Sequence, residues 1–539
     1  VAEGQELLTI DVYDDAANYN GIQTGWFAKV IKDRFNIELN IIASQVVGNT
    51  IYATRSQEGN LGDIILVDKA KFPEIVEAGL AKDISDKLPE CENIMKFRNQ
   101  IDVYNKGLTG EDGKYYGIPT EMTDTSPTTL TDDVIYSSPM LRWDLYKEIG
   151  APKLENLDDL LAALAKIHEI HPANEDGDPA YPFSLWPDWD GNDNMIGIAN
   201  VVQLTTWYGE KLKGSAMLKP DGTFSPLYDR ENAYYKITRF LNKANQMGLV
   251  DPDSGTQNWD NAVSKMSTGR VDMMWYSWQV GFWNSVDRLN AGTGFIFIPV
   301  EDMNFYADAD RYFGSDRMFG IGVAVEGEKY DRIMAFLDWY ASPEGAVFQH
   351  NGIEGLNYVV ENGKFKPYKD NALMDNLPVP DEFGGGGYND GNNQINQWIV
   401  SALCVNPLTG ERYAQKYWQS YKDMTMTEMK KEWTEMFGAE DDVAWMKQNG
   451  KLLASPSVDF TPVADNNDFI ALRSEVNKCL CEYTWNLIMT CSTDEEFEAM
   501  WDEMITQMDG FGYQELFAHR VRIVFEKRSP VIFEKQFLG

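Results

Sequence analysis

LLTIDVYD, residues 7–14, opens a pattern that continues with GWFAKVIKDRF (25–35), IELNIIAS (37–44) and GDIILVD (62–68). The first, third and fourth segments are apolar runs of strand length, whereas 25–35 carries apolar residues at helical spacing. A second helix is expected before the last strand, which gives the order strand, helix, strand, helix, strand. This order predicts a mostly parallel sheet with helices on both faces.

The ligand side of such a sheet is predictable from its strand directions. Ligands of open α/β sheets collect at the carboxyl ends of the strands. Here those ends are Tyr13 to Asn20 and Leu66 to Lys69.

The chain has 539 residues, more than the roughly 250–300 at which one hydrophobic core stops growing, so at least two packed units are expected. Amphipathic helices are predicted over 157–171, 231–248 and 329–345. A final helical run from about 468 to 509 is expected to close the fold. No segment approaches the ~18 uninterrupted apolar residues of a membrane span.

The formal net charge is −37, and the basic residues are scattered along the chain. Nucleic acid is therefore a poor candidate partner, because phosphate recognition needs a basic patch or stripe. The same charge repels an anionic lipid surface, so membrane attachment is expected only through a covalent lipid anchor.

The five cysteines lack the paired spacing of zinc ligands, so buried free thiols are expected. The first residues, VAEGQELLTIDVYDD, contain neither an initiator Met nor an apolar leader. A processed secreted protein has this appearance, as does a trimmed chain.

Aromatic residues gather in three segments: SLWPDWDG (184–191), TTWYGE (205–210) and VDMMWYSWQVGFWN (271–284). Flat indole faces match the apolar face of a pyranose ring, and neighbouring Asp, Asn and Gln side chains can hydrogen-bond its hydroxyls. Trp275 lies in the predicted strand and is assigned to the core. The candidate ligand contacts are Trp186, Asp188, Trp189, Asp190, Asn192, Trp207, Trp278 and Trp283. For each tryptophan, core packing remains the alternative.

Other polar motifs carry weaker signals. The four-glycine run at 384–387 lacks the features of a phosphate-binding loop and is predicted to be a flexible rim loop. His168 and His171 are expected to decorate a helix C-terminus, and a metal site there is disfavoured. DWDGNDN (188–194) resembles half of a calcium loop but lacks the closing Glu.

Catalysis has little support in the sequence. No GxSxG elbow or Cys–His pairing stands out, and 84 acidic residues make any carboxylate spacing uninformative. We therefore expect a binding protein, no catalytic residues and no metal ligands. A glycoside hydrolase and a surface glycan-binding adhesin or scaffold remain the alternatives.

The chain resembles the extracellular solute-binding proteins of bacterial ABC sugar importers, in the large subgroup typical of Gram-positive bacteria. The resemblance rests on five segments in order: 62–88, DGKYYGIPTE (112–121), 141–164, GRVDMMWYSW (269–278) and IMAFLDWYASPEGAVFQHNGIEGLNY (333–358). Each motif is loose by itself, whereas their order and spacing are specific.

This resemblance implies a two-lobed periplasmic-binding-protein-like α/β fold, in which each lobe has a mostly parallel sheet flanked by helices. Hinge crossings are expected near 125, 322 and 372. Lobe 1 is then 1–125 plus 323–372, and lobe 2 is 126–322 plus 373–539 with a helical extension. In the hinge segment, Gly117 would permit unusual dihedrals and Pro119 would stiffen the strand.

The resemblance also implies ligand positions. They map onto Tyr13 and Asp14, Asp68, Glu121 and Trp278. Some relatives hold a structural calcium in a loop that corresponds to NEDGDPAYPF (174–183), but here the loop starts at Pro172 and is a residue short. No cofactor is expected, with a structural calcium as the alternative.

The function that the resemblance implies is capture of an oligosaccharide in an interlobe cleft and delivery to the permease subunits of an ABC transporter. The protein is expected to be a monomer, extracellular, and tethered to the outer face of the membrane as a lipoprotein. Hemicellulose or host-glycan fragments in a gut bacterium are plausible ligands.

Overall fold

The structure is a computed structural model that describes residues 5–124, 135–189, 197–213, 215–220, 223–308, 312–368, 377–389, 395, 397–455 and 466–527. The chain folds into two compact units. The described residues of unit 1 lie within 5–124 and 312–425, and those of unit 2 lie within 135–308, 426–455 and 466–527.

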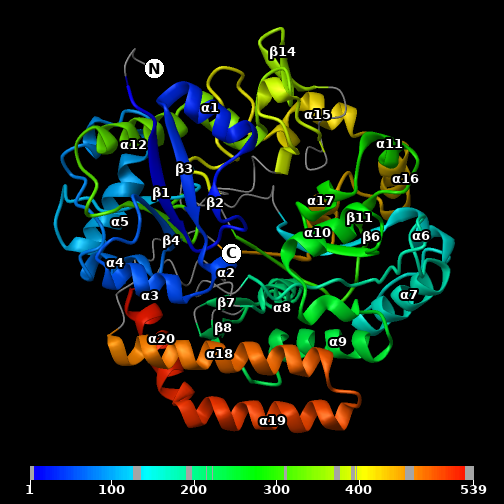
Figure 1. Ribbon diagram of the computed structural model, residues 1–539. Helices are drawn as coiled ribbons and strands as arrows, with labels where there is room; N and C mark the ends of the chain where they lie inside the picture. The colour runs from blue at the N-terminus through cyan, green and yellow to red at the C-terminus, as the bar shows by residue number, and fades with distance from the viewer. Residues whose placement is uncertain are drawn as a thin grey trace. The chain divides into compact units, whose positions relative to one another are not determined.

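Unit 1 is built on a six-stranded sheet with the order β2-β3-β1-β4-β13-β5. Figure 1 labels its first four strands, β1 to β4. In its centre, β1 (Leu8–Asp14) pairs in parallel with both β3 (Ile37–Ile42) and β4 (Ile64–Asp68). The remaining strands pair antiparallel to their neighbours: β2 (Gly21–Ile22), β13 (Arg317–Ile321) and β5 (Ile118–Pro119). The parallel centre predicted from the first 68 residues is confirmed.

Both faces of this sheet are covered, because successive residues of a strand point to opposite sides. Ile64 and Leu66 of β4 pack in one core cluster, with α1 (Gly25–Phe35) and α12 (Gly327–Tyr340). Ile65 and Val67 pack in a second cluster, with α4 (Phe72–Glu77) and Tyr104 of α5 (Arg98–Thr109). A strand buried on both faces explains the unbroken apolar run that the sequence shows.

The predicted lobe boundaries need two corrections. Strand β13 falls within the predicted bounds of lobe 2, but it pairs with β4 and β5 inside unit 1. Residues 377–425 also fall within the predicted bounds of lobe 2, but they belong to unit 1. The indole of Trp26 donates to the Tyr388 carbonyl at 2.8 Å and stacks on the Tyr388 ring at 5.0 Å. These contacts join segments far apart in the chain, which local sequence patterns do not report.

Unit 2 departs from the predicted parallel sheet. One of its sheets has the order β10-β6-β11, and β6 (Ser137–Arg142) is antiparallel to both neighbours, β10 (Met273–Tyr276) and β11 (Phe295–Phe297). Parallel pairing occurs between two short strands, β12 (Phe305–Asp308) and β16 (Leu452–Ser455), and in isolated bridges such as those from Tyr181 to Val271 and from Phe183 to Val250. The alternation of strands and helices does not fix strand direction when neighbouring strands are distant in the chain.

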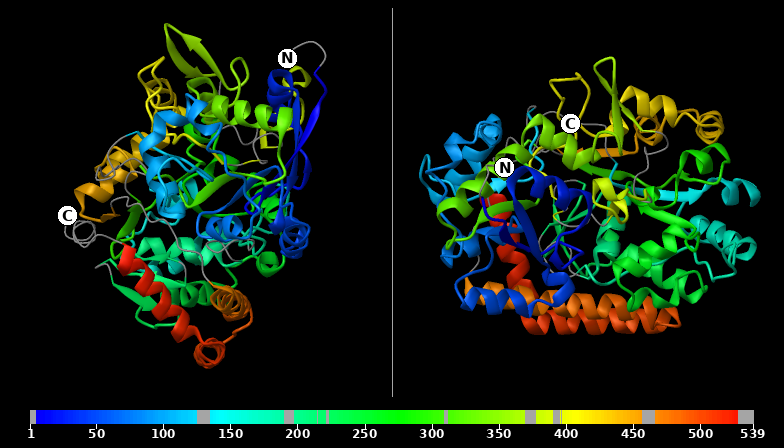
Figure 2. Two further views of the ribbon diagram at one scale, coloured as in Figure 1. Left: turned by 90° about the vertical axis from the view of Figure 1, so that its left-hand side faces the viewer. Right: turned by 45° about the horizontal axis from the view of Figure 1, so that its top comes forward.

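The predicted C-terminal helical run is divided into two helices. α18 (Asn467–Met489) and α19 (Asp494–Phe511) lie side by side (Figures 1 and 2), and α20 (Tyr513–Lys527) follows them. The Thr493 hydroxyl caps α19 by accepting from the Glu496 amide at 3.2 Å. α18 packs on α9 (Ala233–Gln246) of the same unit.

All five cysteines are free; four are buried, as predicted, and Cys481 is half-buried. None of the helices that the structure describes combines the length and hydrophobicity needed to cross a membrane.

Two glycines of unit 1 are required by close packing. We expected Gly117 to allow unusual backbone dihedrals, but its φ is not positive. The glycine is required instead by packing, because a Cβ there would lie 2.7 Å from Met318 and 2.8 Å from Phe72. A Cβ at Gly322 would lie 1.8 Å from the carbonyl oxygen of Gly62.

Gly322→Ala should therefore force a backbone shift at the contact between residue 322 and Gly62, which lies just before β4. We expect the free energy of unfolding to fall by about 1–3 kcal/mol, as for other overpacked sites, measured by urea denaturation.

Gly510→Ala is the matched control, because a Cβ on this α19 glycine meets no atom within 4 Å. It should raise stability by about 0.5–1 kcal/mol through helix propensity. Equal effects of the two variants would contradict the packing argument.

Candidate ligand-binding site

Six aromatic side chains of unit 2 form one packed group, called here the aromatic cluster: Trp186, Trp189, Trp259, Trp275, Tyr276 and Trp278. Two come from β10, and Trp259 is the first residue of α10 (Trp259–Ser267). Trp186 stacks on Trp275 with ring centroids 5.5 Å apart, and Tyr276 stacks on Trp278 at 4.8 Å. The structure thus brings together three of the predicted tryptophans, Trp186, Trp189 and Trp278.

The cluster has a buried side and an exposed side. Trp186 and Trp275 are fully buried, whereas Trp278 is half-buried. Tyr136 is 42% exposed, packs edge-on against Tyr276 at 5.5 Å, and its hydroxyl accepts from the Trp278 indole at 3.4 Å. Trp278 and Tyr136, called here the aromatic edge, offer flat apolar surface beside polar atoms. Such a surface suits a sugar ring better than a purely apolar ligand.

Two predicted tryptophans lie outside this cluster. Trp207 is fully buried and donates from its indole to the Ser137 hydroxyl at 3.0 Å, so it serves the core. Trp283 lies beneath the Arg288 guanidinium at 3.6 Å, and its indole donates to the Thr293 carbonyl at 2.9 Å. The contacts of both residues are those of side chains packed inside unit 2, which was the alternative to ligand binding.

Asp188 lies at the base of the cluster and accepts from the Trp259 amide at 2.9 Å. Its other carboxylate oxygen is buried without a hydrogen-bond partner in the described part of the chain. Burial raises the pKa of Asp188, and the bond from Trp259 partly opposes this. The predicted ligand residues Asp190 and Asn192 lie outside the described residues.

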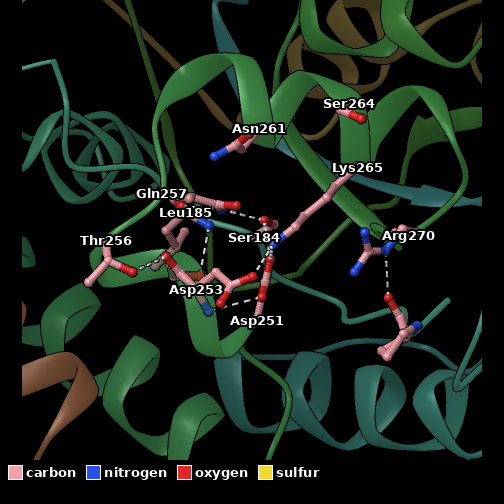
Figure 3. A network of polar contacts seen from close by, with 12 residues as sticks. Ser184, Leu185, Asp251, Asp253, Thr256, Gln257, Asn261, Ser264, Lys265 and Arg270 are labelled. Carbon is pink, nitrogen blue, oxygen red and sulfur yellow. Dashed lines mark hydrogen bonds and ion pairs between the residues drawn. The ribbon is translucent and has the colours of Figure 1, made fainter.

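A buried polar network fixes the segment that leads into Trp186 (Figure 3). Lys265 of α10 donates to Asp251 at 2.6 Å and to Asp253 at 2.9 Å. The Ser184 hydroxyl donates to the same Asp251 carboxylate at 2.8 Å. Gln257 donates to both the Ser184 hydroxyl and the Leu185 carbonyl. The backbone before Trp186 is therefore tied to the loop and helix that carry Trp259.

At the carboxyl edge of the unit 1 sheet, the predicted residues enter an internal ion network. Arg317 of β13 donates to Asp14 at 2.8 Å and also pairs with Asp15. Asp68 is bonded through its amide to Asp15 at 3.3 Å. Burial raises the pKa of Asp14 to about 7, although the Arg317 charge acts in the opposite direction.

Tyr13, Asp14 and Asp68 are all buried within unit 1, which differs from the solvent-facing position expected of ligand contacts. Burial also raises the pKa of the Tyr13 hydroxyl. Their direct contact with a ligand stays a prediction. The geometry supports a role for Asp14 in fixing the ends of β1 and β13.

Glu121 has a left-handed backbone conformation, with φ of 52°. Its amide donates to the Trp398 carbonyl at 2.7 Å, which helps to hold this costly geometry. Glu121 lies two residues after the end of β5, and a strained non-glycine residue is typical of a functional position. Ligand contact by Glu121 stays a prediction.

The two histidines lie at the end of α7 (Leu157–Ile170), as predicted. His168 stacks on Tyr181 at 5.6 Å. His171 pairs with the buried Asp272 at 2.7 Å, and burial raises the pKa of that carboxyl.

The loop expected to correspond to a calcium site is held in its turn by the Asn174 side chain. The Asn174 side chain accepts from the amides of Asp176 and Asp178 at 3.1 and 2.8 Å. Across the described ranges, no three His, Cys, Asp or Glu side chains are grouped to hold a metal ion.

A surface groove of about 670 Å³ lies elsewhere in unit 2, along α9. Its charged side chains include Arg230, which pairs with Glu498 and Asp502 of α19, and Arg239, which pairs with Asp494. Arg230 and Arg239 of this groove are thus engaged in attaching α19, so the groove is not our candidate site.

The sequence did not single out Trp259, Tyr276 or Tyr136. Trp259 stands alone among polar neighbours, Tyr136 directly follows the apolar pair Val134 and Ile135, and Tyr276 lies in a segment that predicts a strand. The cap residue Asn258 before Trp259 was the available signal that this tryptophan begins a helix.

The model for the bacterial extracellular solute-binding proteins matches residues 20–347, more than half of the chain. The chain belongs to this family. Among curated proteins, Lipoprotein LipO of Bacillus subtilis (strain 168) is 26% identical over 322 residues. That match spans 57% of this chain and 58% of LipO.

Solved structures of low identity share the fold. The alginate-binding protein AlgQ2, determined without calcium ion, matches with a TM-score of 0.61 at 16% identity, covering 96% of this solute-binding protein and 98% of AlgQ2. The S. pneumoniae ABC-transporter substrate-binding protein FusA in complex with kestose matches with a TM-score of 0.61 at 12% identity, covering 95% and 98%. An HMO-binding solute-binding protein from Bifidobacterium longum infantis gives 0.52 at 13%, covering 99% of each chain. The two-lobed α/β fold class is confirmed.

Lys265→Met should destabilise this solute-binding protein by about 3 kcal/mol, because it leaves the Asp251 carboxylate buried without its cation. Urea denaturation measures the loss, and the near-ultraviolet circular dichroism of the aromatic cluster should change in the same variant.

The matched control is Lys243→Met, whose amine lies 3.9 Å from an 80% exposed Asp158. This exposed pair should change stability by less than about 0.5 kcal/mol. An equally small effect at Lys265 would show that the network does not hold the Trp186 segment.

Proposed function

We propose that this protein is the substrate-binding component of a bacterial ABC transporter and that its substrate is an oligosaccharide. It binds the ligand and does not hydrolyse it. The observation that carries the proposal is the aromatic edge, in which Trp278 and Tyr136 present exposed surface on a tightly packed aromatic support. Membership of the solute-binding family and the shared fold of sugar-binding proteins support it.

The ligand is a neutral sugar. The nearby cation Lys265 is committed to Asp251 and Asp253, and Arg288 is committed to Trp283. With a net charge of −37, the protein as a whole also repels anions.

We further propose that the protein acts at the outer face of the membrane as a lipid-anchored monomer and delivers its ligand to permease subunits. The likeness to Lipoprotein LipO supports the anchor.

The ligand class is tested by calorimetry against a panel of β-manno-, xylo-, malto- and milk-type oligosaccharides. We expect at least one to bind saturably and to be recovered intact after incubation. Shortened products would indicate a glycoside hydrolase. Failure of the whole panel to bind would overturn the proposal and favour an adhesin or scaffold.

Trp278→Ala should weaken binding of the oligosaccharide found in this panel more than tenfold, because it removes the indole face of the aromatic edge. This corresponds to at least about 1.4 kcal/mol. The melting temperature should also fall modestly, since Trp278 stacks on Tyr276.

Trp283→Ala is the control, because it removes another half-buried indole of unit 2 that lies outside the cluster. It should lower the melting temperature and change the affinity less than threefold. If both variants lose affinity equally, the aromatic edge is not the binding surface.

We propose that ligand binding needs no calcium, because the Asn174 side-chain oxygen, a candidate calcium ligand, already accepts from the amides of Asp176 and Asp178. Addition of EDTA should leave affinity and melting temperature unchanged. A calcium-dependent rise in melting temperature of several degrees would contradict this expectation.

A further inference from the structure

Residues 197–200, which lead into α8 (Ala199–Leu204) and form its start, join the aromatic cluster to the C-terminal helices. On the cluster side, Asn200 accepts from the Trp186 amide at 3.1 Å, and the Ala199 carbonyl accepts from the Tyr276 hydroxyl at 3.5 Å. On the other side, the indole of Trp485 in α18 donates to the Gly197 carbonyl. All three contacts lie within unit 2.

α18 is a firm base for this last contact. Asn242 of α9 donates to the carbonyls of Ile488 and Cys491 at 3.3 and 2.8 Å, near the end of α18. The hydroxyls of Tyr234 and Thr484 are bonded at 2.5 Å, and both residues are fully buried. Thr484 directly precedes Trp485, so the backbone that carries this indole is fixed on α9.

We propose that Trp485 is a positioning residue for the aromatic edge. The C-terminal helices would then contribute to ligand affinity without contacting the ligand. Trp485 holds the residues before α8, α8 orients Trp186 and Tyr276, and Trp278 stacks on Tyr276. The effect on affinity rests on the proposed function, whereas the effect on the cluster does not.

A purely structural role for Trp485 makes a different prediction. Loss of its hydrogen bond would then lower stability and leave the cluster unchanged. Trp501 of α19 provides the comparison, because its indole also donates to a backbone carbonyl, that of Tyr228, at 3.0 Å. Trp501 is fully buried, so its replacement should cost at least as much stability as replacement of Trp485.

The test compares Trp485→Phe with Trp501→Phe, both without ligand. Each change removes an indole N–H and keeps an aromatic ring. Hydrogen exchange of the Trp186 amide and of residues 273–278 should become about three- to tenfold faster in Trp485→Phe and stay unchanged in Trp501→Phe. Near-ultraviolet circular dichroism should report the same difference. Unchanged exchange at Trp186 in Trp485→Phe would overturn the proposal.

Asn200→Ala provides a second route if Trp485→Phe fails to fold. It removes the acceptor of the Trp186 amide while α18 stays intact, and the same exchange at 273–278 should accelerate. Unchanged exchange there would show that α8 does not orient the cluster.

The final measurement uses the panel oligosaccharide that binds the wild-type protein. Trp485→Phe should weaken its binding about three- to tenfold and Trp501→Phe less than twofold. Equal affinities of the two variants would overturn the proposed role in binding. If no oligosaccharide binds the wild type, the proposed function fails, and the exchange experiment still decides whether Trp485 positions the cluster.

Discussion

The stacking of Trp278 on Tyr276 is the contact on which the candidate site depends. A side chain that binds a ligand must keep exposed surface, yet a side chain that is free to rotate loses conformational entropy when the ligand arrives. Trp278 meets both demands, since it is half-buried and its ring rests on a Tyr276 that is 1% exposed. Much of the ordering cost is thus met when the protein folds.

The buried side of the aromatic cluster also needs polar contacts that fix its position. Packing Trp186, Trp189 and Trp275 together buries three indole N–H groups for which the described residues supply no acceptor. Each such group costs about 1–3 kcal/mol, whereas a buried aromatic side chain of 150–250 Å² contributes roughly 4–6 kcal/mol. Burial therefore outweighs the unmet hydrogen bonds. Lys265 and Asp251 add directional bonds that the stacked rings cannot provide.

Sequence reasoning succeeded where the pattern is local. β4 was predictable because a strand covered on both faces is a nearly continuous apolar run, and β1 because its apolar residues alternate with polar ones. The intervening helix over 25–35 has clear helical periodicity. The boundaries failed where long-range pairing decides, as for β13 and for Tyr388, which lies 362 residues from its partner Trp26.

The aromatic residues show the same limit. Trp207, Trp278 and Trp283 all occur in aromatic segments, and their different surroundings depend on Ser137, Tyr276 and Arg288. Arg288 illustrates why composition alone could not separate them, because its cation covers one face of the Trp283 indole. Trp278 is instead covered by an uncharged ring on one face and retains exposed surface. The identity of the stacking partner therefore decides which indole is available, and only the folded chain determines that partner.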